Sequence, residues 1–175
     1  MTSITADLSF KGVLRRITVL FIFLLNCEVT VVSTGMGEIA KAFSNVDPVL
    51  INLVYTFPIL ISVIVTFFLV PPLAKRFDKK NLVIFALFVY LFGGIGCVFT
   101  TGSIYHLIGM RAFVGIGAGI AAPLCGAIIN ELYDGRDKQN MLGWANGVDS
   151  LMAIILVTIA GYLCAIKWNY LFWVY

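Results

Sequence analysis

The chain has 175 residues, of which 61% are hydrophobic and only 12% are charged, and its net charge at pH 7 is +3. A soluble domain carries about twice this share of charged residues, so the composition excludes an ordinary soluble fold. The basic residues flank long apolar runs. This placement indicates orientation in a lipid bilayer and argues against a nucleic-acid partner.

Five segments are long and apolar enough to cross a bilayer core of about 30 Å as helices. In chain order they cover residues 17–37, 49–71, 82–100, 104–129 and 141–166, and a sixth apolar segment starts near Trp168. Strands of a membrane barrel would alternate polar and apolar residues, whereas these runs are apolar on all faces. The sequence therefore predicts an all-α, polytopic bundle of transmembrane helices with about five complete spans.

Short connections join the predicted spans, and their basic residues predict the orientation. If the amino terminus lies in the cytoplasm, only Lys41 and Lys167 face the outside. The cytoplasmic side then holds Lys11, Arg15, Arg16, Lys75, Arg76, Lys79, Lys80, Arg136 and Lys138. Because cytoplasmic loops are enriched in Lys and Arg, we expect a multi-pass protein of the plasma membrane with a cytoplasmic amino terminus.

Three charged residues, Glu28, Arg111 and Asp149, lie inside predicted spans. A charge at the bilayer centre costs at least about 2.5–3.5 kcal/mol, so such residues often serve function. With a rise of about 1.5 Å per residue, Glu28 lies near the midplane and Arg111 about 10 Å from the outer face. Each could instead be a structural ion pair or hydrogen bond, and Asp149 could reach the cytoplasmic surface.

Small residues are concentrated in the fourth predicted span, where Gly115, Gly117 and Gly119 stand in close succession. Glycines four residues apart let two helices approach closely in a membrane, so we expect this face to pack tightly. The fifth span has a similar pair, Gly143 and Gly147, with the same expectation. The glycine run is not a nucleotide-binding loop, because no strand precedes it.

No residue pattern indicates an enzyme or a metal site. The four cysteines, Cys27, Cys97, Cys125 and Cys164, are scattered singly in apolar runs. Zinc sites need paired spacings, and no cluster of His, Cys or carboxylates stands at a membrane interface. We therefore expect no cofactor and no metal.

The fourth span carries the most specific motif of the chain. Its residues are Leu107, Arg111, Ala112, Gly115, Gly117, Ala118 and Gly119. This pattern resembles the arginine motif of the major facilitator superfamily, and in particular of its drug:proton antiporter branches. In that family the motif is implicated in proton transfer. Val114 stands here in place of the usual glutamine.

Two further segments resemble the same family. Glu28, Thr30, Val31 and Val32 are similar to its acidic first-helix pattern. Residues 71–80 resemble the loop that gates the cytoplasmic side, with Leu73, Lys75, Arg76, Asp78, Lys79 and Lys80 as the loop residues. Lys75 replaces the family's aspartate, which reverses the charge, and Glu131 matches the acidic partner of this loop. The antiporter motif of the fifth helix is mostly absent.

The resemblance implies secondary active transport of a small organic solute, coupled to protons and directed outward. Members have about twelve helices in two halves with the substrate between them, so residues 1–175 would form part of the amino-terminal half. The implied partners are a small-molecule substrate, protons, the lipid bilayer, and a carboxy-terminal half or a second copy. The alternative is a truncated or remnant transporter fragment without activity of its own.

Overall fold

The structure, a computed structural model, describes residues 28–100 and 103–174. The described elements are α2 (Glu28–Ala42), α3 (Pro48–Ile64), the π-helix η2 (Val65–Leu69), α4 (Val70–Arg76), α5 (Lys79–Val98), α6 (Ile104–Leu132), α7 (Gly135–Ile166) and the 3-10 helix η3 (Trp168–Val174). All the described elements are helical, which confirms the predicted all-α bundle. Among the described residues, four helices are long and apolar enough to cross a membrane.

The second predicted span is one continuous helical stretch made of α3, η2 and α4, over Pro48–Arg76. Asp47 begins it as an N-cap, because its side-chain oxygen accepts a hydrogen bond of 2.9 Å from the backbone N–H of Val49. Its 29 residues extend about 44 Å, which exceeds a hydrocarbon core of about 30 Å. The helix therefore continues beyond the lipid into the headgroup region.

The structure also extends the later spans. α5 begins at Lys79 instead of residue 82, and α7 begins at Gly135, six residues before the predicted start at Met141. Hydropathy detects only the part of a helix that lies in lipid, whereas the polar first turns of both helices lie outside it. Gly135 adopts a φ of 53°, a left-handed conformation that glycine accepts readily and that permits the tight corner after α6.

The first and sixth predicted spans are described only in part. The described part of α2 runs from Glu28 to Ala42, five residues past the predicted end at Gly37, and residues 17–27 lie outside the described part. The segment after Trp168 forms η3, a 3-10 helix of seven residues. A 3-10 helix is favoured in short pieces because its hydrogen-bond geometry is poorer than that of an α-helix.

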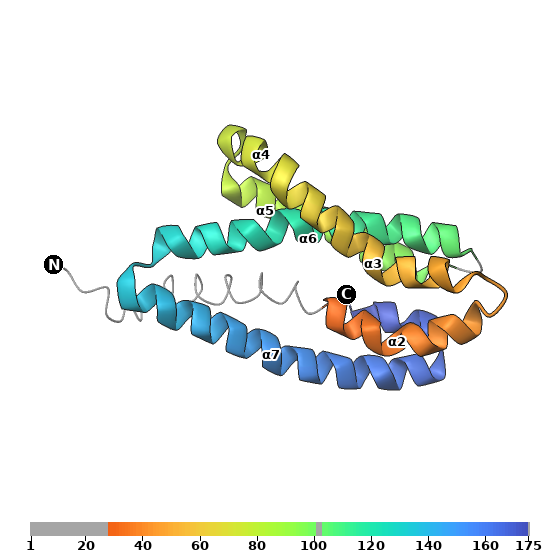
Figure 1. The fold of residues 1–175 in the computed structure, drawn as a ribbon. Helices are drawn as coiled ribbons and strands as arrows, with labels where there is room; N and C mark the ends of the chain where they lie inside the picture. Colours follow the sequence, from red (N-terminus) through yellow and green to blue (C-terminus); the bar gives the residue numbers. More distant parts are fainter. Residues whose placement is uncertain (1–27, 101–102, 175) are drawn as a thin grey trace.

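Two buried clusters hold the described helices together. One joins η2, α5, α6 and the start of α7, with Val83, Ala86, Leu124 and Ile129 among its members. The other joins α2, α3, α6, α7 and η3 at the opposite end of the bundle. Figure 1 shows α3, α5 and α6 on one side and α2 and α7 on the other, with α6 and α7 diverging from their shared corner.

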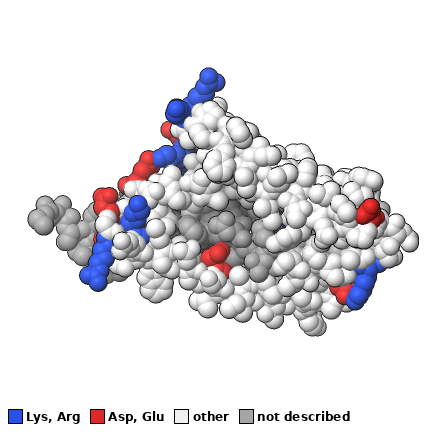
Figure 2. Space-filling model, in the orientation of Figure 1, with Lys and Arg blue, Asp and Glu red and all other residues white. Residues whose placement is uncertain are grey.

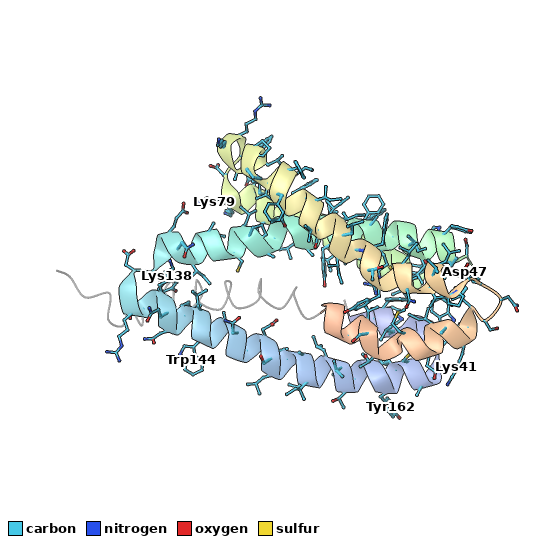
Figure 3. All side chains as sticks on the ribbon, viewed as in Figure 1. Lys41, Asp47, Lys79, Lys138, Trp144 and Tyr162 are labelled. Carbon is cyan, nitrogen blue, oxygen red and sulfur yellow. The ribbon has the colours of Figure 1, made fainter. Side chains whose placement is uncertain are left out.

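Charged side chains gather at the two ends of the bundle, while the surface between the ends is mostly uncharged (Figure 2). Lys79 and Lys138 lie at one end, and Lys41 and Asp47 lie at the other (Figure 3). The large apolar side chains between them are widely exposed, including Phe67 at 71% and Phe88 at 70%. An apolar belt between two charged ends is the surface that a bilayer requires.

Candidate functional site

Arg111 is the most deeply buried charged residue among those described, with an exposed fraction of 1%. It lies on α6, two turns from the helix start at Ile104. Its guanidinium carbon lies 4.8 Å from the centre of the Phe172 ring of η3. A cation over an aromatic face is stabilised by the ring quadrupole, and this contact gains in strength where water is excluded.

An aromatic chain continues from this contact toward α2. Phe172 packs edge-on against Trp168 with ring centres 6.5 Å apart, and Trp168 packs edge-on against Phe43 at 5.2 Å. The neighbouring Leu171 lies directly on Gly35 of α2, where an added Cβ atom would clash with the leucine side chain. η3 therefore contacts both α2 and α6, the two helices that carry the predicted Glu28 and Arg111 pair.

The side chain of Glu28 lies outside the described part, and only its backbone, within α2, is described. Val32, one turn further along α2, is buried in the same cluster as Leu107, one turn before Arg111. The pairing of Glu28 with Arg111 stays a prediction. Asp149, the third predicted residue, lies half-buried on α7.

The glycines of α6 lie against two neighbouring helices. A Cβ atom on Gly115 would come within 2.5 Å of the Pro58 carbonyl oxygen, and one on Gly119 within 2.6 Å of the Ser62 carbonyl oxygen. Both contacts are with the backbone of α3. Gly117 faces the other way, toward the backbone of Tyr90 on α5. α6 is therefore in close contact with α3 and α5 along this run.

The fifth-span glycines have different surroundings. A Cβ atom on Gly143 or Gly147 would meet no described atom within 4 Å. The predicted tight packing of that pair therefore has no counterpart among the described residues. Their spacing resembles that of Gly115 and Gly119, so spacing alone does not tell which small pair faces a helix.

Most of the predicted gating loop is helical: residues 71–76 lie in α4 and Lys79 and Lys80 begin α5, so only Phe77 and Asp78 connect the two helices, at the charged end that includes Lys79 (Figure 3). Within it, the Lys79 ammonium forms an ion pair and hydrogen bond with the Glu131 carboxylate at the end of α6. The structure thus brings together two residues 52 positions apart, both named from the sequence. Among the described residues, no carboxylate forms an ion pair with Lys75, Arg76 or Lys80.

At the opposite end, Lys41 donates a hydrogen bond of 2.7 Å to Glu38, and this bond together with the nearby carboxylate charge raises the pKa of Lys41. Both side chains are exposed and lie beyond the predicted end of the first span. They form a local surface pair one turn apart on α2.

Two features near the site have no motif in the sequence. Phe172 contacts Arg111 from a segment 61 positions away, and nothing in its surroundings marks it as a cation partner. Thr66, in the π-helix, donates a hydrogen bond of 2.8 Å to the carbonyl oxygen of Gly119 on α6. A lone threonine in an apolar run is the only sequence signal for that bond.

No group of three or more potential metal ligands occurs in the part of the chain that the structure describes. Cys97, Cys125 and Cys164 are buried among apolar side chains. They behave as small apolar residues that fill space between helices.

The chain is similar to several transporters. It is 22% identical over 155 residues to an uncharacterized MFS-type transporter YwfA of Bacillus subtilis, covering 88% of this chain and 37% of that protein. It is 24% identical over 146 residues to multidrug resistance protein 3 of the same organism, and this match covers 83% of this chain and 28% of that protein. It is 26% identical over 157 residues to the MFS-type efflux pump MMF1 of Pseudozyma antarctica, and this match covers 89% of this chain and 28% of that protein.

The chain thus spans about a third of the length of the curated relatives that it matches. No solved structure matches it. The sequence pattern of the Major Facilitator Superfamily matches residues 18–175, which is nearly the whole chain. Together with the helical bundle and its apolar belt, this match shows that the chain belongs to the Major Facilitator Superfamily of membrane transporters.

Proposed function

We propose that this chain forms part of a proton-coupled transporter that exports a small organic solute. The observation that carries the proposal is Arg111, a cation that is 1% exposed within a helix long enough to span the membrane. A buried charge is costly and must be held by partners, which makes it a strong marker of an ion or substrate pathway. Two relatives have names that describe multidrug resistance and efflux.

In this proposal Glu28 carries the proton and Arg111 tunes it. Burial near the midplane favours the protonated carboxylic acid, whereas a nearby guanidinium favours the carboxylate. Asp149 is the second candidate carrier, because it is half-buried within a predicted span. The comparisons do not favour the alternative of an inactive remnant.

The test uses proteoliposomes that contain the complete transporter, this chain joined to its second half, under an imposed proton gradient. A fluorescent organic cation such as ethidium serves as the transported probe. Glu28→Gln preserves shape but removes the titration, so proton-driven accumulation should stop while probe binding persists. Arg111→Lys should shift the pH optimum of transport.

The matched control is Glu38→Gln, which removes a carboxylate from the exposed end of the same helix. Its transport should equal that of the parent. If Glu28→Gln accumulates the probe against a gradient as well as the parent does, Glu28 does not carry the proton. Asp149→Asn is then the next variant to measure.

A further inference from the structure

A groove with a volume of about 370 Å³ lies between α4 and the first turns of α5. It is lined by Leu73, Phe77, Asn81, Leu82 and Phe85, so four of its five side chains are apolar. Phe77 and Phe85 are more than half exposed, while Leu82 forms the buried floor. The groove is open to the surroundings of the bundle and is not a closed cavity within it.

Three basic residues stand next to the groove-lining residues in the chain, at the charged end of the bundle. Lys75 and Arg76 form the last turn of α4, and Lys80 lies in the first turn of α5. All three are exposed, and none forms an ion pair with a described carboxylate. Lys79 differs because it is already bound to Glu131, and Asp78 offsets only one of the remaining three charges.

The groove continues into an exposed apolar stripe on α5. Phe85, Phe88 and Phe92 are 54%, 70% and 60% exposed. Their spacing of three and four residues places them on one face of the helix. This face leads away from the basic end along the bundle, within a helix long and apolar enough to span the membrane.

We propose that this groove binds one anionic phospholipid of the adjacent membrane leaflet, with its phosphate at Arg76 and Lys80. One acyl chain lies between Leu73, Phe77 and Phe85 and continues along the α5 stripe. A cationic rim above an apolar groove matches a headgroup phosphate above a hydrocarbon chain, and basic pockets at helix ends bind such lipids. Arg76 can hold phosphate oxygens with two parallel N–H donors. The proposal needs only membrane insertion, not the proposed transport reaction.

The test measures which lipids remain bound to the purified 175-residue chain when it is released from detergent in native mass spectrometry. Phosphatidylglycerol and phosphatidylcholine with identical acyl chains compete at equal concentration. We expect one phosphatidylglycerol to be retained in preference. The double variant Arg76→Gln/Lys80→Gln should lower the affinity for phosphatidylglycerol about ten- to thirtyfold, because two cations near the membrane surface are lost.

The matched control is Arg136→Gln/Lys138→Gln, which removes the same charge from the start of α7, where Arg136 is exposed and Lys138 is half-buried. It should keep the preference, and an equal loss there would overturn the proposal in favour of diffuse attraction. Asn81→Trp fills the groove without changing the charge and should also release the lipid, whereas Asn52→Trp, exposed on α3, should not. Unchanged retention in Asn81→Trp would contradict the groove as the binding site. A changed oligomeric state without lipid loss would instead identify a protein interface.

Discussion

At the scale of single residues, close backbone approach and burial distinguish the site from the rest of the bundle. Gly115 and Gly119 bring the backbone of α6 against that of α3, and Arg111 lies one turn before them. In lipid, apolar side chains gain little from leaving their solvent, so helix association depends on close packing and hydrogen bonds. The same glycines that join the helices therefore also hold the buried arginine in place.

Gly115→Ala should destabilise the chain by about 1–3 kcal/mol, because the added methyl group would meet a backbone oxygen of α3 that has no free rotation. Gly109→Ala is the matched control on the same helix, since its Cβ atom would meet no described atom within 4 Å. This control should be neutral or stabilising by up to about 1 kcal/mol, because alanine favours a helix more than glycine does. Thermal unfolding in detergent measures both. Equal melting temperatures for the two variants would contradict the packing described here.

The glycine contacts of α6 and the contact between Arg111 and Phe172 differ in how far the sequence could predict them. The glycine run and Arg111 stand in a recognisable motif, so the residues themselves could be named before the structure. Phe172 could not, because a cation–π partner is selected by tertiary packing and its position depends on how η3 folds back. Gly143 and Gly147 show the converse, since their spacing is right but no described atom lies close to them.

At the scale of elements, the π-helix η2 is the irregular segment of the second span. The backbone N–H of Val70 bonds to the Val65 carbonyl, five residues back instead of four. Pro71 and Pro72 follow at once, and neither has a backbone N–H to donate, so the regular ladder is broken here. Single-turn π segments are frequent at functional sites. This one lies between the close approach at Ser62 and the basic end of α4.

Thr66→Val should destabilise the chain by about 0.5–1.5 kcal/mol, because it removes the hydrogen bond from η2 to Gly119 while preserving side-chain shape. Thr56→Val provides the control. Its hydroxyl bonds within its own helix, to the Asn52 carbonyl at 3.0 Å, and is exposed. Its loss should change stability by less than about 0.5 kcal/mol. Chemical unfolding in detergent micelles compares the two, and the interpretation fails if Thr66→Val is as stable as the parent.

The ion pair between Lys79, at the start of α5, and Glu131, at the end of α6, should matter more for transport than for stability. Lys79 and Glu131 are 32% and 61% exposed, and ion pairs in contact with water contribute about 0–1 kcal/mol. Glu131→Gln should therefore leave the melting temperature nearly unchanged. In the complete transporter we expect it to alter the transport rate, because the resemblance assigns this loop to gating.

Asp137→Asn is the control for that experiment, since it removes an exposed carboxylate at the start of α7. It should alter neither stability nor rate. A large loss of stability in Glu131→Gln would show that the pair is structural. An unchanged rate in proteoliposomes would separate the pair from gating.

The helical type followed from hydropathy, and four of the five predicted spans coincide with described helices that are long and apolar enough to cross a membrane, but the helix ends did not follow. α5 and α7 begin in polar turns, at Lys79 and Gly135, which a lipid-based criterion cannot detect. The π segment was also missed, since no short-range pattern distinguishes it from a helix that ends at Pro71. In each case the deciding factor lies outside the apolar run, in caps, loops and contacts with neighbouring helices.

On the face of the whole molecule that Figure 2 shows, charged side chains gather at two ends, and the surface between them is apolar apart from one acidic side chain. The length of the chain is about a third of that of the relatives it matches. Alternating access in this family needs two bundles that rock about one site. We therefore expect that this chain alone does not move the organic cation probe across liposomes, unless two copies assemble.

The last prediction concerns which charged end faces the cytoplasm. Asp78 and Asp137 are exposed at the end that carries Lys79 and Lys138, whereas Asp47 is exposed at the end that carries Lys41. Because basic residues are retained on the cytoplasmic side, a single cysteine at Asp47 should react with a membrane-impermeant thiol reagent added to intact cells. Single cysteines at Asp78 and Asp137 should react only after the membrane is permeabilised. Three of the four native cysteines, at 97, 125 and 164, are buried, so their background reaction should be low, and Cys27 is replaced by alanine in every variant. Labelling at Asp78 from outside, with Asp47 protected, would reverse the orientation and move the proposed lipid site to the outer leaflet.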